Sequence, residues 1–308
     1  MRVKIRHGLT RLGVIKHPTY DGVHLSLLNQ LGSVQHYYHF MMGFIIPLIK
    51  VWPDVVAKAA GRQIYVRSCA VMDPIIDELK LEGLCILTES THKSLRDNAK
   101  TLRRVGHRLD YHSEAGFDTP AAYDPAMFFM VRAQLSDRLC AEIASERKAL
   151  EPLFKASEPR VLIIDRLRPD PFYRSEDSEA KSSGAQRRSV ANMVELVALA
   201  RSRHASVALL SLEGRSLSSQ IALFSMVDII VAQHGAALTN LLWARTGTNV
   251  IEILPDKLLE SKFIPLFFSN LCTAMRLHHH VLNQPFNHGP ANVGDFATIL
   301  DSLLSKRP

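Results

Sequence analysis

The His-Gly-Ala turn at residues 234–236 has the residue types best suited to binding an anion. It follows a short β-branched run at 228–232, typical of a buried strand, and precedes a helical pattern at 237–244. The first N–H groups of a helix carry the positive end of its dipole, and glycine allows another group to approach the backbone closely. We therefore predict that a diphosphate binds at this turn. In the alternative interpretation, Gly235 only makes the turn and His234 is a hydrogen-bonded core residue.

Two further side chains stand at the ends of predicted strands. Arg166 follows the buried strand 161–164, so it lies at the same sheet edge as His234 and could bind phosphate oxygens bidentately. In the alternative interpretation, Arg166 is a solvated loop arginine without a ligand. Glu252 interrupts the apolar strand 250–254, and a buried carboxylate needs donors, which the hydroxyls of a nucleotide ribose or an arginine could supply. Asn240 is counted with the donor-binding residues, where it is predicted to be a structural hydrogen-bonding residue more than a direct ligand.

Several motifs of other enzyme classes do not occur in the sequence. It has no Asp-x-Asp pair to hold a metal-bound diphosphate, no GxGxxG or P-loop pattern, and no GxSxG nucleophile elbow. His278-His279-His280 is adjacent on a predicted strand, where neighbouring side chains point to opposite faces, so the three do not converge on one ion. We expect no metal and no cofactor.

The alternation of strand and helix patterns predicts an α/β fold in two domains, residues 1–155 and 156–308. From residue 160 onward, strands at 161–164, 206–210, 228–232, 250–254 and 275–281 alternate with helices that include 258–270 and 293–304, which indicates a doubly wound domain. In the first domain, strands are predicted at 23–27, 63–67 and 84–88, with helices at 73–81 and 125–150. No firm element is predicted at 89–125.

Composition is that of an ordinary soluble protein, with 47% hydrophobic and 22% charged residues. A net charge of +7 indicates affinity for acidic partners, among them nucleotide diphosphates, anionic glycans, nucleic acid and membrane surfaces. Four scattered cysteines fit reduced thiols in a cytosol, and residues 31–49, with two histidines and a proline, form a poor membrane span. No signal peptide is evident. We expect a cytoplasmic protein, with peripheral attachment to the inner membrane surface as a further hypothesis.

The stretch DIIVAQHGAALTNLLWARTGTNVIEILP closely resembles the C-terminal signature of glycosyltransferase family 61. In that signature a strand leads to His-Gly-Ala, then to an Ala/Gly-Leu-Thr-Asn helix, a glycine-containing loop and a Val-Ile-Glu strand. A second, shorter resemblance begins at Tyr37-Tyr38-His39-Phe40. The family also has an arginine after the first strand of this domain and an arginine cluster before the next helix, matched by Arg166 and by Arg187, Arg188 and Asn192.

The resemblance implies a GT-B type fold, in which two Rossmann-like domains face each other across a cleft. It also implies inverting, metal-independent transfer of a sugar from a nucleotide-sugar donor, such as a UDP-sugar, to a glycan acceptor. Bacterial members of the family build surface polysaccharides. Nucleic acid is not an expected partner.

An inverting transferase needs a base for the acceptor hydroxyl, and His39 is the candidate. His39 could instead be satisfied within its aromatic cluster, and His36 and Asp73 are the substitutes. Two other functions stay open: a nucleotide-sugar epimerase of the same fold, and a non-catalytic protein that binds a nucleotide sugar or glycan.

Overall fold

The computed structural model describes residues 20–28, 34, 36–87, 105–112, 123–166, 174–175, 178–179, 188–262 and 264–305. The chain divides into two compact units. The first comprises Met1–Leu28, Val51–Ser68 and Lys80–Tyr111, and the second comprises Asn29–Lys50, Cys69–Leu79 and His112–Pro308. Three stretches of chain therefore build the second unit, whereas the predicted boundary at residue 155 divides the sequence only once.

The first unit contains a sheet in the order β3-β2-β1-β4. Its strands are β1 (Tyr20–Leu28), β2 (Ile64–Arg67), β3 (Leu84–Leu87) and β4 (Val105–His112). β2 runs parallel to both β1 and β3. The first three strands confirm the predictions. β4 lies in the region where no element was predicted, because its sequence VGHRLDYH is too polar to indicate a buried strand.

The sheet of the second unit has five parallel strands in the order β11-β10-β9-β5-β8. In chain order these are β5 (Arg160–Ile164), β8 (Ser206–Leu210), β9 (Ile229–Gln233), β10 (Asn249–Pro255) and β11 (His278–Gln284). The chain passes from β5 outward to β8 and then back across β5 to β9. This reversal is that of a doubly wound, Rossmann-like domain, as predicted.

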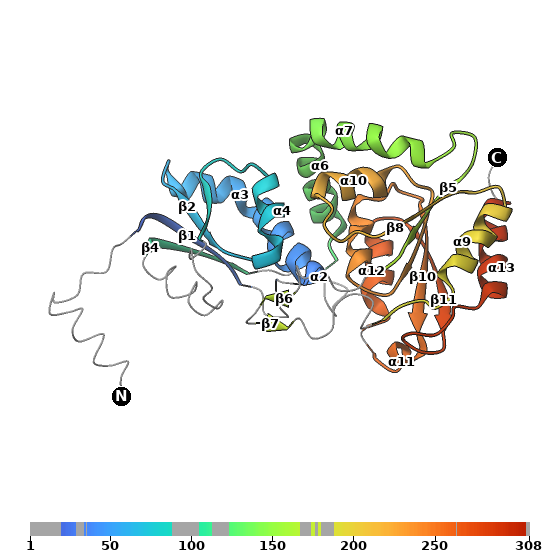
Figure 1. Ribbon diagram of the computed structural model, residues 1–308. Coiled ribbons are helices and arrows are strands. Elements are labelled where there is room, and N and C mark those ends of the chain that lie inside the picture. The colour runs from blue at the N-terminus through green and yellow to red at the C-terminus, as the bar shows by residue number, and fades with distance from the viewer. Residues whose placement is uncertain are drawn as a thin grey trace. The chain divides into compact units, whose positions relative to one another are not determined.

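Helices cover both faces of this sheet, as Figure 1 shows. α9 (Met193–Ser202) and α13 (Val293–Leu304) pack together with the sheet in one hydrophobic core. On the other face, α10 (Leu217–Ser225) and α12 (Leu266–Ala274) contact η6 (Ala236–Trp243), and α7 (Cys140–Leu150) packs on α10. Because both faces are covered, β5 from Val161 onward and β9 up to Ala232 are continuous buried apolar runs.

Further elements complete the described chain. They are α2 (Tyr37–Phe40), η1 (Met41–Ile45), α3 (Ile46–Ala59), η2 (Ala70–Met72), α4 (Asp73–Glu78), α6 (Pro125–Arg138), η4 (Glu151–Leu153), α11 (Asp256–Leu259) and the antiparallel pair β6 (Arg174–Ser175) and β7 (Ser178–Glu179). The helical run Tyr37–Ala59 has 23 residues, and an 18-residue window within it has a mean hydropathy of 1.6, so by length and composition it could cross a membrane. Since 61% of that window is buried, it equally fits the core helix of a soluble protein.

Several predicted elements differ in detail from the structure, among them the helix predicted at 73–81, which ends at Glu78. The helix predicted at 125–150 is interrupted at Leu139, the helix predicted at 258–270 is replaced by α11 and α12, and the last strand begins three residues later than predicted. The helix after Gly235 is a 3₁₀ helix rather than an α-helix. There the side-chain amide of Asn240 donates to the carbonyl of Ala237 at 3.2 Å, competing with the backbone for that acceptor.

Candidate functional site

A cavity of about 400 Å³ lies at the carboxyl edge of the second unit's sheet. Its lining includes the segments that follow β5 (Ile164–Arg166), β8 (Leu212–Ser216) and β9 (Gly235–Ala237). β5 and β9 are the neighbouring strands whose connections leave in opposite directions, which is where open α/β sheets bind ligands. The volume suits a small ligand.

Two short segments of the same unit add to the lining. His36 and Tyr37 are contributed by the start of α2, and an apolar wall is contributed by Val71, Met72, Pro74 and Ile75. Arg166, Arg188 and Arg215 also line the cavity, together with the carboxylates of Glu78, Asp165 and Glu213. The cavity thus combines cationic, acidic and apolar surfaces.

Arg166 lies directly against the Gly235 turn. Its Nη2 donates to the carbonyl oxygen of His234 at 2.7 Å, and a Cβ added at Gly235 would stand 1.9 Å from that same nitrogen. Gly235 has an extended backbone, with φ 160° and ψ −175°, which other residues also adopt. Glycine is therefore required here for the room it leaves to the guanidinium, rather than for its backbone conformation.

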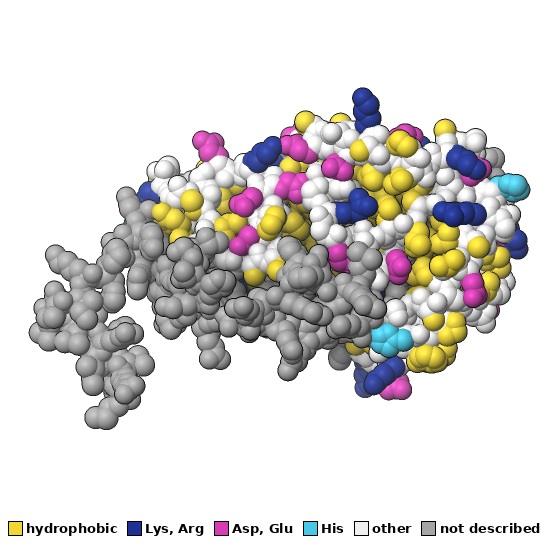
Figure 2. All heavy atoms as spheres, viewed as in Figure 1, with side chains coloured by type: hydrophobic (Ala, Val, Ile, Leu, Met, Phe, Trp, Pro, Cys, Tyr) yellow, Lys and Arg dark blue, Asp and Glu magenta, His cyan; other side chains and the backbone are white. Residues whose placement is uncertain are grey.

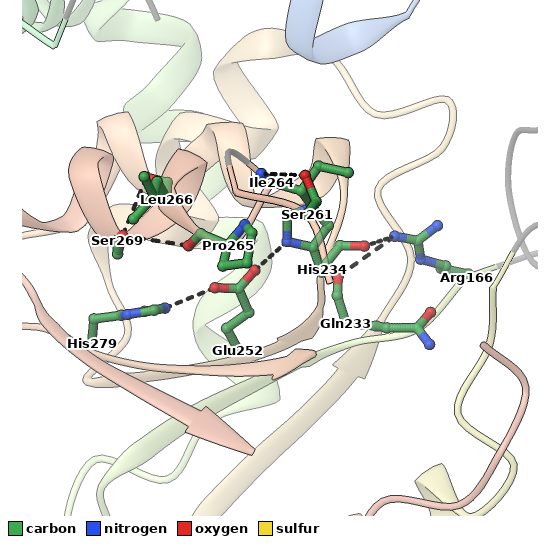
Figure 3. A network of polar contacts seen from close by, with 10 residues as sticks. All are labelled: Arg166, Gln233, His234, Glu252, Ser261, Ile264, Pro265, Leu266, Ser269 and His279. Atoms are coloured by element: carbon green, nitrogen blue, oxygen red, sulfur yellow. Dashed lines mark hydrogen bonds and ion pairs between the residues drawn. The ribbon is translucent and has the colours of Figure 1, made fainter. Parts of the chain in front are cut away.

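Beneath the turn, a buried carboxylate connects three strands (Figure 3). Glu252 of β10 is 0% exposed and accepts from His234 Nδ1 at 2.5 Å and from His279 Nε2 at 2.8 Å. His234 follows β9, and His279 lies on β11. Glu252 therefore has hydrogen-bond donors within the protein, as its structural interpretation requires. These donors are histidines rather than the arginine considered from the sequence. Neither Glu252 nor His234 is among the described residues that line the cavity.

The ionisation of this group follows from its burial and hydrogen bonds. Burial lowers the pKa of His234, and the charges of Arg188 and Arg166 lower it further, against the opposing effect of Glu252. Burial alone would raise the pKa of Glu252, but the hydrogen bonds from His234 and His279 outweigh it and lower the pKa. At neutral pH the carboxylate is ionised and His234 is neutral, with its hydrogen on Nδ1 because a carboxylate only accepts.

The predicted arginine cluster is described in part. Arg188 is 4% exposed and lines the cavity, whereas Arg187 lies outside the described residues. Asn192 fixes the chain that leads into α9, since its side chain donates to the carbonyl of Ala291 at 3.0 Å and accepts from the N–H of Ala291 at 2.9 Å. Arg188 is thus positioned in the cavity and Asn192 supports the backbone nearby.

Asn240 and the start of α2 are joined by hydrogen bonds. Asn240 Oδ1 accepts from Tyr37 Oη at 2.8 Å and from Trp243 Nε1 at 3.1 Å, and its amide donates to Gln220 at 2.8 Å. This network holds α2 against η6, so Asn240 has the structural role that we predicted while also lining the cavity.

His36, the N-cap residue of α2, lines the cavity, whereas His39 within α2 does not. The His39 ring lies edge-on to Tyr38, with 5.7 Å between ring centroids, and 6.2 Å from His36. Both belong to the second compact unit, although they were predicted to lie in the N-terminal domain. Asp73, the other substitute, accepts from the N–H of Cys69 at 2.6 Å.

Some residues that line the cavity were not identified as site residues from the sequence. Glu213 and Arg215 follow the predicted strand 206–210, and the rule that placed Arg166 at the sheet edge would have found them as well. Glu78 carries no such local signal. Its carboxylate accepts from the N–H groups of Leu217 and Ser218 at 2.6 and 2.8 Å, at the start of α10. Among the described residues, no group of three His, Cys, Asp or Glu side chains could hold a metal ion.

Comparison with known proteins identifies the family. The family model for glycosyltransferase 61 matches residues 37–251, well over half of the sequence. The chain therefore belongs to glycosyltransferase family 61, as its sequence motifs suggested. The match includes α2, Arg166 and the Gly235 turn. No curated protein matches the chain.

We expect Gly235→Ala to fold normally and to bind anions poorly. The added Cβ meets the far end of a flexible side chain, so Arg166 moves aside while the extended backbone persists. Losing one charge-assisted hydrogen bond should weaken pyrophosphate binding about 10- to 100-fold. Calorimetric titration measures the affinity, and thermal unfolding monitors the fold. Wild-type affinity in a folded variant would contradict the role of this contact.

We also expect the free energy of unfolding to fall as the pH is lowered below about 6.5. The unfolded state takes up a proton on His234 near its ordinary pKa of 6.5, while burial keeps the folded form neutral to lower pH. Glu252 acts in the same direction below its ordinary pKa of 4.5. Denaturant titrations at pH 5–8 give the free energy of unfolding at each pH. Between pH 5 and 6.5 this free energy should depend less steeply on pH in His234→Asn, whose amide nitrogen replaces Nδ1, than in the wild type. Equal pH dependence in the two proteins would contradict the lowered pKa of His234.

Proposed function

We propose that this protein transfers a sugar from a nucleotide-sugar donor of the UDP class to a glycan acceptor, with inversion at the anomeric carbon and without a metal ion. The observation that carries the proposal is the Arg166 guanidinium packed on the Gly235 turn at the point where the strand order reverses. A second observation, the family membership, supports transfer of a sugar between a donor and an acceptor.

The donor diphosphate would bind to the cationic part of the cavity. Arg166, Arg188 and Arg215 supply fixed positive charge, which stabilises the negative charge that develops on the departing diphosphate. Arginine binds phosphate oxygens bidentately, and its charge does not depend on pH in the physiological range. Three arginines at one sheet edge could thus take the role that a metal ion has in other sugar transferases. The GT-B arrangement of two domains across a cleft stays part of the proposal.

The location in the cell also stays a proposal. We place the enzyme in the cytoplasm, where nucleotide sugars are made, with peripheral contact at the inner membrane surface. The net charge of +7 supports attraction to anionic lipids. On the face shown in Figure 2, however, basic and acidic side chains of the described residues are interspersed, so the attraction would be diffuse.

The test of this function is turnover of nucleotide sugars with and without EDTA. We expect slow release of the nucleoside diphosphate from a UDP-sugar, faster release with a glycan acceptor, and unchanged rates in EDTA. Loss of activity that Mn²⁺ or Mg²⁺ restores would contradict metal independence. Conversion of one nucleotide sugar into another would instead identify an epimerase, and binding without turnover would identify a binding protein.

The acceptor hydroxyl needs a general base, which we assign to His39. We expect His39→Ala to lower kcat by about 10²–10⁴-fold with UDP affinity nearly unchanged. His36→Ala is the matched comparison, because His36 starts the same helix and lines the cavity. If only the His36 variant loses kcat, the role belongs to His36. If His39→Ala unfolds while His36→Ala remains active, His39 is a core residue.

A further inference from the structure

Among the described carboxylates that line the cavity, Glu213 is the one that binds no other group of the protein. It lies in the loop between β8 and α10, lines the cavity and is partly exposed. Within the described part of the chain, its side chain makes no hydrogen bond and no ion pair. The other cavity carboxylates differ: Glu78 accepts from the start of α10, and Asp165 Oδ1 accepts from the N–H of Arg166 at 2.8 Å. Glu213 is therefore available to a ligand.

The sheet topology brings Glu213 close to the Arg166 end of the cavity. β5 and β8 are neighbours with Ile164 opposite Leu210, and the N–H of Asp165 donates to the carbonyl of Leu210 at 2.9 Å. The segments that carry Arg166 and Glu213 therefore leave the sheet side by side. In doubly wound domains that bind dinucleotides, an acidic residue after the second strand binds a ribose hydroxyl, while the phosphates bind at the first turn.

The apolar wall supplies a surface for the rest of a nucleoside. Met72 is buried, and Val71, Pro74 and Ile75 complete a surface that offers no hydrogen bonds from its side chains. A base could pack on this wall with its ribose at Glu213 and its diphosphate at Arg166. The three surfaces of the cavity, cationic, acidic and apolar, match the three parts of a nucleoside diphosphate.

We propose that Glu213 binds the ribose 2′- and 3′-hydroxyl groups of the donor nucleotide and so makes the enzyme selective for ribonucleotides. This inference rests on the proposed function. It replaces the sequence-based expectation that Glu252 binds the ribose, because the two carboxylate oxygens of Glu252 accept from His234 and His279 inside the protein.

The test compares UDP with 2′-deoxy-UDP by calorimetric titration of the full chain. Wild-type protein should bind UDP about 10- to 100-fold more tightly, the worth of one hydrogen bond to a charged group. Glu213→Ala should lose most of that preference, chiefly through weaker UDP binding. Glu260→Ala, which removes an exposed carboxylate outside the cavity, should keep the wild-type preference.

Equal wild-type affinities for the two ligands, or an unchanged preference in Glu213→Ala, would overturn the assignment while leaving the proposed function in place. Failure of all four common ribonucleoside diphosphates to bind wild-type protein would overturn both. The wild-type comparison needs no variant. If Glu213→Ala does not fold, the isosteric Glu213→Gln gives the second measurement, with the same direction of change.

Discussion

The buried carboxylate of Glu252 is the constraint on which the site depends. A carboxylate with no exposed surface is strongly destabilising unless hydrogen-bond donors surround it, and the two histidines meet that need. One of them, His234, is also the residue whose carbonyl accepts from Arg166. The Glu252 carboxylate thus orients the His234 ring, and the ring in turn holds the backbone of the turn. The His234 carbonyl then positions the Arg166 guanidinium at the cavity.

The doubly wound sheet explains why these groups meet. Residues far apart in sequence, at the ends of β5, β8 and β9, share one edge because parallel strands all end on the same side. Covering helices make the strands rigid, and the loops between them carry the side chains with chemistry.

Much of this arrangement could be predicted from the sequence, because the pattern that marks a buried strand is local in the chain. Strands buried on both faces are continuous apolar runs, so the residues that follow them, Arg166 and Gly235, could be assigned to the sheet edge. The partners of Glu252 could not be predicted, because His279 reaches it only through the pairing of β10 with β11. The same holds for His36 and the apolar wall, which enter the second unit through long-range packing that no local pattern records.

The most direct measurement of the central claim is the affinity of UDP for Arg166→Ala, with Arg166→Lys as the matched control. Removing the guanidinium should weaken binding by about 1.5–3 kcal/mol, the usual worth of a charge-assisted hydrogen bond. Lysine should recover part of that loss, since it keeps the charge but not the bidentate geometry. Unchanged UDP affinity in a folded Arg166→Ala protein would contradict the account.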